Sequence, residues 1–146
     1  MAVQRDDPYR NFPFLVDLGP GPKLGFSEVL LGASRIEPVL YREGADLVGE
    51  ARKLPGRATT DNVVLRRGIT GDLSLYQWWD ATRNGDPNVR RTVRVHLLAE
   101  DRSGPVYTWK LLRAWPSVIE FGPLRGLGQE VAVETLELAY DRLELE

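Results

Sequence analysis

The sequence predicts a mainly β fold built from antiparallel strands, with a single α-helix. Three observations support this prediction. Residues 106–116 (VYTWKLLRAWP) alternate at period two, residues 91–99 alternate in the same way just before them, and only residues 72–83 repeat with the period of a helix. At 146 residues the chain is long enough to bury a core of its own, so we expect a single domain over residues 1–146.

The strand at residues 106–116 is expected to be covered on both faces. Both alternating sets contain large apolar groups, whereas a strand with one wet face alternates strictly between apolar and polar residues. Pro116 cannot donate a ladder hydrogen bond, so it marks the end of the strand or a bulge. One face is predicted to carry Tyr107, Trp109, Leu111, Arg113 and Trp115.

The N-terminal part of the chain reads as a polar arm followed by short strands. Residues 1–11 are polar and irregular, and residues 12–18 form a first strand that ends at a Gly-Pro-rich turn. Residues 24–31 and 36–42 are two further strand candidates. Because Pro38 lies inside the second of these, we expect an edge strand or a bulge there.

A long exposed loop is predicted at residues 43–57. This segment contains three glycines and a proline, with charges throughout. Loops longer than about 12 residues are uncommon in compact domains and are usually functional or disordered. Residues 59–69 then resume the strand pattern, with Val63, Leu65 and Ile69 on one side.

The one convincing helix is predicted at residues 72–83. Asp72 suits the N-cap, and Asn84-Gly85 supply a stop. A stripe along this helix carries two tryptophans and therefore needs a partner surface. The stripe consists of Leu75, Trp78, Trp79 and Thr82.

The C-terminal half is predicted to contain a hairpin and a further strand. Residues 91–115 should form an antiparallel β-hairpin, because a short turn at residues 101–105 separates two alternating stretches. Residues 129–145 fit either a helix stripe or two strand phases offset by one residue. The β-branched start and the β-rich context favour a long strand with a bulge.

Composition excludes several classes of function. The absence of cysteine excludes disulfides and thiolate metal sites, and a single histidine, His96, excludes the usual multi-histidine zinc sites. A net charge of −2, from 19 basic and 21 acidic residues, argues against a dedicated nucleic-acid binder. Residues 1–12 lack the apolar core of a signal peptide, and no segment approaches the roughly 20 apolar residues of a membrane span. We expect no cofactor and no membrane insertion.

No pattern of catalytic residues emerges. His96 lies between arginines on a polar strand face, without the orienting partner that a general base needs. Five carboxylates could meet in space, but their spacing does not require it: Asp72, Asp80, Asp86, Glu134 and Glu137. The basic groups, including Arg66-Arg67, lack interleaved aromatics and are taken as solvated faces or subunit ion pairs. We therefore expect no enzymatic activity.

Six short blocks, in order along the chain, resemble a known family. They lie at residues 41–44 (YREG), 53–56 (KLPG), 65–70 (LRRGIT), 75–78 (LYQW), 109–116 (WKL running into AWP) and 130–139 (EVAVE, then LELA). Over about residues 8–145 the chain resembles the tail tube proteins of contractile phages and of extracellular contractile injection systems, relatives of the type VI secretion tube protein.

The resemblance implies an antiparallel β-barrel or sandwich of two packed sheets with one flanking helix. It also implies hexameric rings that stack into a hollow tube, a conduit for DNA or protein cargo inside a sheath. The implied partners are further copies of the chain, the sheath protein, the baseplate or spike, tube-terminating proteins and transient cargo. The subunit would be cytoplasmic during assembly and then part of a virion tail or a released injection particle.

The resemblance also suggests which residues mediate assembly. Charged residues in and beside the predicted loop are candidates for contact between stacked rings: Arg42, Glu43, Arg52, Lys53 and Arg57. Apolar residues of the helix and central strand are candidates for the core or the subunit interface: Leu75, Trp78, Trp79, Tyr107, Trp109 and Trp115. The alternative is a monomeric β-barrel module whose aromatic pocket binds a small ligand or a protein. Two choices stay open at this point. The machine is either a phage tail or an injection particle, and the chain is either the bulk tube subunit or a tube-initiating variant.

Overall fold

The computed structural model describes residues 2–20, 25–45 and 49–146. Contacts divide the chain into two compact units, one of Met1–Leu31 with Asn62–Glu146 and one of Gly32–Asp61. The second unit is a two-stranded hairpin, and a hairpin of this kind is marginally stable alone in water. The single domain expected over residues 1–146 therefore stays a prediction.

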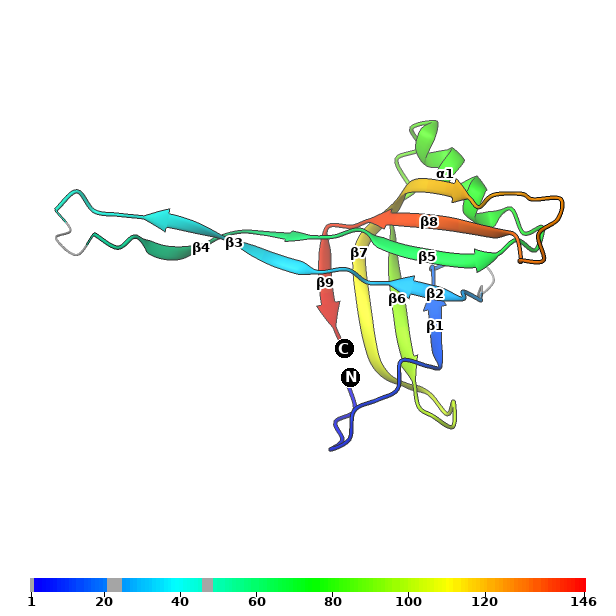
Figure 1. The fold of residues 1–146 in the computed structure, drawn as a ribbon, viewed down its shortest axis with the longest axis horizontal. Coiled ribbons are helices and arrows are strands. Elements are labelled where there is room, and N and C mark those ends of the chain that lie inside the picture. Colours follow the sequence, from blue (N-terminus) through cyan, green and yellow to red (C-terminus); the bar gives the residue numbers. More distant parts are fainter. Residues whose placement is uncertain (1, 21–24, 46–48) are drawn as a thin grey trace. The chain divides into compact units, whose positions relative to one another are not determined.

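The larger unit is an antiparallel β structure with one helix, as predicted (Figure 1). Its elements are β1 (Phe14–Asp17), β2 (Glu28–Leu30), β5 (Val63–Gly68), α1 (Ser74–Arg83), β6 (Arg91–Leu98), β7 (Pro105–Phe121), β8 (Val133–Ala139) and β9 (Arg142–Leu145). The strand order is β1-β6-β7-β8-β5-β2, and β9 also pairs with β7. Among the described strands, β1 and β2 have one partner each, so the structure is an open sandwich rather than a closed barrel.

The long strand β7 belongs to both halves of this sandwich. Its first part pairs with β6 and β9, and its second part pairs with β8 (Figure 1). The two halves bury their inner faces against each other together with α1. The core that results is apolar and consists of Val16, Leu18, Val63, Leu65, Leu75, Trp78, Val93, Val95, Leu111, Ala114, Leu136 and Leu138.

Two bulges in β7 change which residues face the core. Arg113 has a positive φ of 57°, and the register with β6 shifts there. A second shift follows Pro116, so the bulge predicted at this proline is confirmed, and the strand continues to Phe121. The predicted common face of Tyr107, Trp109, Leu111, Arg113 and Trp115 is therefore wrong beyond Leu111. Ala114 and Pro116 lie on the core side instead.

The C-terminal segment consists of two strands rather than one bulged strand. The register of β8 with β5 is regular throughout, so the bulge expected within residues 129–145 is absent. The strand β8 instead ends at Ala139, and the next strand, β9, pairs with the first part of β7. The phase change in the sequence arises because the core-side position before Leu136 is Glu134, which is 6% exposed, whereas Val133 lies on the opposite face and Val131 lies before the strand.

The smaller unit contains β3 (Ser34–Tyr41) and β4 (Arg52–Thr60). The loop predicted at residues 43–57 is therefore wrong from Arg52 onward, because those residues pair with β3. Residues 42–45 and 49–51 are exposed and irregular, as predicted, and residues 46–48 lie outside the described part. The shift expected at Pro38 is confirmed.

The other predictions for the larger unit hold in part. Within residues 25–31 only Glu28–Leu30 is a strand, and Ile69 lies after β5 and is 44% exposed, so its predicted place beside Val63 and Leu65 is wrong. The hairpin over residues 91–115 is confirmed as β6 and β7, and the irregular arm at residues 2–11 and the strand at residues 12–18 are also present. Met1, Leu24 and residues 21–22 of the Gly-Pro-rich turn lie outside the described part. None of the described helices is long and apolar enough to cross a membrane.

Candidate assembly surfaces

The hairpin β3–β4 exposes apolar side chains on both of its faces. All of β3 is exposed, with Ile36 at 63% and Leu40 at 68%. Alternation and register divide these side chains between the faces. One face carries Ile36, Pro38, Leu40, Pro55 and Ala58, and the other carries Val39, Tyr41 and Leu54. Exposed apolar groups gathered in this way are typical of an interaction surface.

Gly56 fixes a bulge in this hairpin. Between Ile36 and Pro38 the register shifts, and β4 contributes one more residue than β3. A Cβ at Gly56 would lie 2.5 Å from the carbonyl oxygen of Glu37 and 2.7 Å from Cγ2 of Val39. Only glycine fits here without movement of the backbone. This close approach gives a physical reason for the glycine in the KLPG block.

An ion pair closes the base of the hairpin. Arg35 Nη1 lies 2.5 Å from Asp61 Oδ1, and Asp61 Oδ2 accepts a hydrogen bond from the Ala33 amide at 3.0 Å. The hydrogen bond from Arg35 holds the pKa of Asp61 below its ordinary value. Since both side chains are largely exposed, the pair contributes little to stability and chiefly fixes where the hairpin begins.

The five charged residues proposed for ring stacking all lie in the hairpin unit and are exposed. Arg42 and Glu43 follow β3 directly, and the other three lie on β4. In the register, Arg52 is opposite Tyr41 and Lys53 is opposite Leu40. None of the five forms an ion pair within the described part of the chain. Their role in stacking remains a prediction.

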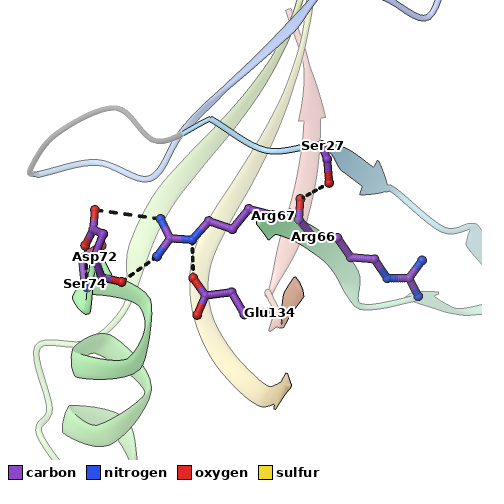
Figure 2. Close-up of polar contacts among 6 residues, drawn as sticks. All are labelled: Ser27, Arg66, Arg67, Asp72, Ser74 and Glu134. Carbon is purple, nitrogen blue, oxygen red and sulfur yellow. Dashed lines mark hydrogen bonds and ion pairs between the residues drawn. The ribbon is translucent and has the colours of Figure 1, made fainter. Parts of the chain in front are cut away.

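A buried ion pair joins β5, β8 and the start of α1 (Figure 2). Arg67 and Glu134 are 4% and 6% exposed and lie directly opposite each other in the β5–β8 register. Arg67 Nε donates to Glu134 Oε1, and Nη2 donates to the backbone oxygen of Asp72 at 3.0 Å. The arginine thereby ties the inner face of the sheet to the residues before the helix. The prediction that Arg66-Arg67 form a solvated face or a subunit ion pair is therefore wrong for Arg67, which is buried and paired within the chain.

The predicted N-cap of α1 is displaced by one residue. Leu73 occupies the N-cap position and makes no capping hydrogen bond through its side chain. The carboxylate of Asp72 still accepts a hydrogen bond from the Ser74 amide at 2.8 Å, which lowers the pKa of Asp72. Asp72 therefore contributes to the helix start without being its cap. The predicted stop is confirmed, with Asn84 as the C-cap.

The six residues predicted for the core or the interface divide between two environments. Leu75 and Trp78 belong to the core, and Trp78 Nε1 donates to the backbone oxygen of Val89 at 2.7 Å. The rings of Tyr107 and Trp109 lie 4.9 Å apart, and Trp109 packs against the core. The half-buried members are Trp79, Tyr107, Trp109 and Trp115.

A second exposed apolar segment, which sequence analysis missed, follows β7. Leu124 is 85% exposed and Leu127 is 101% exposed, in a glycine-rich loop that ends at Val131. In the sequence, the only sign of this segment is that Leu124 and Leu127 stand among turn-forming residues. Single leucines of this kind also occur in ordinary surface loops.

The larger unit also contains an apolar cavity of about 530 Å³ between the arm and the open side of the sandwich. Its apolar lining comes from Phe12, Phe14, Val29, Leu31, Val95, Leu97 and Trp109. No group of three or more potential metal ligands occurs in the described part of the chain. His96 Nδ1 lies 2.8 Å from the hydroxyl oxygen of Thr108 on the neighbouring strand.

Comparison with known proteins identifies the family. The model of the T4-like virus tail tube protein gp19 family matches residues 10–144. The chain belongs to this tail tube family. Tail tube proteins are structural, which agrees with the expectation that the chain has no enzymatic activity. A comparison with curated protein sequences gave no match.

Solved structures agree with the tail tube fold. A chain from the anti-feeding prophage baseplate is 26% identical, with 97% of each chain covered and a TM-score of 0.84. A chain from an extracellular contractile injection system, the PVC sheath-tube complex, is 23% identical over 95% of this chain and 91% of that one, with a TM-score of 0.83. Hcp1 from Flavobacterium johnsoniae has the same fold at 13% identity, with 92% and 94% covered and a TM-score of 0.63. This tail tube protein is thus similar to components of contractile injection machines.

Proposed function

We propose that this chain is the inner tube subunit of a contractile tail or injection machine, and that it forms hexameric rings that stack into a hollow conduit. The match to the tail tube family over residues 10–144 carries this proposal. The exposed hairpin supports it, because a two-stranded unit with apolar groups on both faces requires a surface against which to bury them. Rings that stack head to tail use heterologous contacts, which do not close and so give a filament.

Within this proposal, the hairpin contacts a second copy of the chain in the next ring. Its apolar faces supply the buried area, and Arg42, Glu43, Arg52, Lys53 and Arg57 supply polar contacts at the rim. The partners are further tube subunits, the sheath, the baseplate and a tube-terminating protein, with DNA or protein cargo in the lumen. The subunit is made in the cytoplasm and then becomes part of a virion tail or a released particle.

A charge placed on the hairpin should block stacking without unfolding the protein. Leu40→Asp puts a carboxylate opposite Lys53, which the strand pairing tolerates. Burying a leucine contributes about 1.5–3 kcal/mol, so the concentration needed for tube assembly should rise at least tenfold. Analytical ultracentrifugation and a thermal melt measure the two effects. Leu40→Met is the matched apolar control and should assemble normally; assembly of Leu40→Asp at the wild-type concentration would contradict the role of the hairpin.

A second candidate function rests on the apolar cavity of about 530 Å³. A monomeric module could hold a small apolar ligand there, because binding sites are mostly concave and apolar. The two functions differ in stoichiometry. Light scattering at high protein concentration separates a persistent monomer from rings and tubes.

A further inference from the structure

We propose that a cavity beside α1 binds a carboxylate group through Arg91, and that in the tube a second copy of this chain supplies the carboxylate. The cavity is formed entirely by the larger unit. The identity of the occupant rests on the proposed function. The ability of the cavity to bind a carboxylate does not depend on that function.

Arg91 lies at the edge of the core. It begins β6 on the same face as Val93 and Val95, which are 0% and 2% exposed, and its partner in β7 is the fully buried Ala114. Its guanidinium carbon lies 4.4 Å from the centroid of the Trp78 ring. Burial lowers the pKa of Arg91, yet an arginine stays protonated in proteins. The fold therefore holds a permanent cation beside its core.

This cation has no anionic partner in the described part of the chain. Arg67, the other arginine that faces the core, is paired with Glu134. Among the described residues, no carboxylate lies within 4.0 Å of Arg91, and none accepts a hydrogen bond from its N–H groups. The contact with the Trp78 ring is a cation–π contact and occupies none of the five N–H donors with a hydrogen-bond acceptor oxygen. As far as the described residues extend, those donors are open to a ligand.

The cavity beside Arg91 has a volume of about 240 Å³ and a polar side. That volume is several times the ~30 Å³ share of one water. The Ser74 hydroxyl oxygen is buried in the lining and lies beside the Asp72 carboxylate, to which it can donate, so Arg91 is the main donor available to an anion. Gln77 and Asn88 also line the cavity. Arginine binds a planar carboxylate through two parallel hydrogen bonds, so this donor set favours that group.

Asp86 is the one lining group that opposes an anion. Its Oδ1 accepts a hydrogen bond from the Asn88 amide at 2.9 Å, and it forms no ion pair with Arg91. A like charge beside the cavity should weaken carboxylate binding. Asp86→Asn should therefore strengthen it, an effect opposite in sign to the loss of Arg91.

A second copy is the occupant that the charge pattern favours. The chain carries 21 acidic residues and a net charge of −2. Within the described part, Glu37, Glu43 and Glu50 of the hairpin unit are exposed and form no ion pair. In a filament of one chain, each copy presents its carboxylates to a neighbour through heterologous contacts. An unpaired cation on one copy and unpaired carboxylates on the next are electrostatically complementary.

The cavity itself can be tested on the unassembled full chain at low concentration. Sodium acetate is titrated against sodium chloride at constant ionic strength while NMR follows the Trp78 indole N–H. We expect a saturable shift in the millimolar range, its loss in Arg91→Met, and binding about 2–10-fold tighter in Asp86→Asn. The absence of saturation in the wild type, or an unchanged shift in Arg91→Met, would overturn the site. Saturation by phosphate but not by acetate would overturn the assignment to a carboxylate.

Assembly tests the occupant. Arg91→Met should raise the concentration required for tubes about tenfold or more, because charge-assisted hydrogen bonds contribute about 1.5–3 kcal/mol. Arg90→Met is the control: Arg90 is exposed, pairs with Asp141 at 3.4 Å, and should assemble within twofold of the wild type. Should Arg91→Met not fold, Arg91→Lys keeps the charge without the bidentate fork and should show a smaller increase.

The outcomes separate the two proposals. Acetate binding with unchanged assembly of the Arg91 variants would overturn the second copy as occupant. Failure of the wild type to assemble under any condition would overturn the proposed function and, with it, the second copy. The acetate titration would still decide whether the cavity binds a carboxylate.

Discussion

Trp78→Ala should lower the free energy of unfolding by about 3–5 kcal/mol, the range for removing a buried tryptophan. Trp78 is 3% exposed and packs in the core with Leu75, so its removal leaves a cavity that the surrounding sheets cannot fill. The substitution also leaves the backbone oxygen of Val89 without its donor. Urea unfolding followed by circular dichroism measures the change.

Trp79→Ala is the matched control on the same helix. Trp79 is half-buried, and its Nε1 lies 3.3 Å from the backbone oxygen of Ser117, a longer hydrogen bond than that of Trp78. We expect a loss of about 1–2 kcal/mol. An equal loss in the two variants would contradict the assignment of Trp78 to the core and Trp79 to its edge.

Arg67→Ala should also destabilise the protein by about 3–5 kcal/mol, because it leaves Glu134 as a buried charge without a partner. The same change frees the backbone oxygen of Asp72 and loosens the start of α1. Chemical denaturation measures the loss, and hydrogen exchange of the first turn of α1 shows whether the helix start is affected.

Two further variants show whether the loss in Arg67→Ala comes from the buried unpaired charge or from the removal of any arginine on this strand. Arg66→Ala removes the neighbouring arginine, whose side chain points away from Glu134 (Figure 2). Its ion pair with Glu28 is 3.1 Å long and exposed, so the substitution should cost at most about 1 kcal/mol. The double variant Arg67→Met with Glu134→Leu replaces the buried pair by apolar groups and should recover most of the loss. If Arg66→Ala were as damaging as Arg67→Ala, the buried pair would not be the cause.

Periodicity was sufficient to predict the elements that bury an apolar face. The β6–β7 hairpin and α1 were predicted in type and within two residues at the helix ends, because their buried residues recur at periods of two and 3.6. Leu75 and Trp78 were named as core or interface candidates, and both lie in the core. In these elements, the side chains that recur with the period of the strand or helix are the same ones that pack in the core.

The remaining features depend on contacts that leave little trace in a single sequence. Arg113 adopts a positive φ although arginine carries no signal for that conformation, so the change of face in β7 could not be predicted. The first residues of β4 resemble a loop because the bulge requires Gly56, and glycine ordinarily indicates a turn. Arg67 differs from Arg66 only in which face of β5 it occupies. Its burial follows from the strand register.

Electron microscopy of the purified wild-type protein across a concentration series, with light scattering on the same samples, tests the central claim most directly. The tail tube assignment predicts closed rings of uniform diameter with sixfold symmetry that stack into hollow filaments as concentration rises. Persistent monomers at the highest concentration, with no rings or filaments in any buffer, would contradict it.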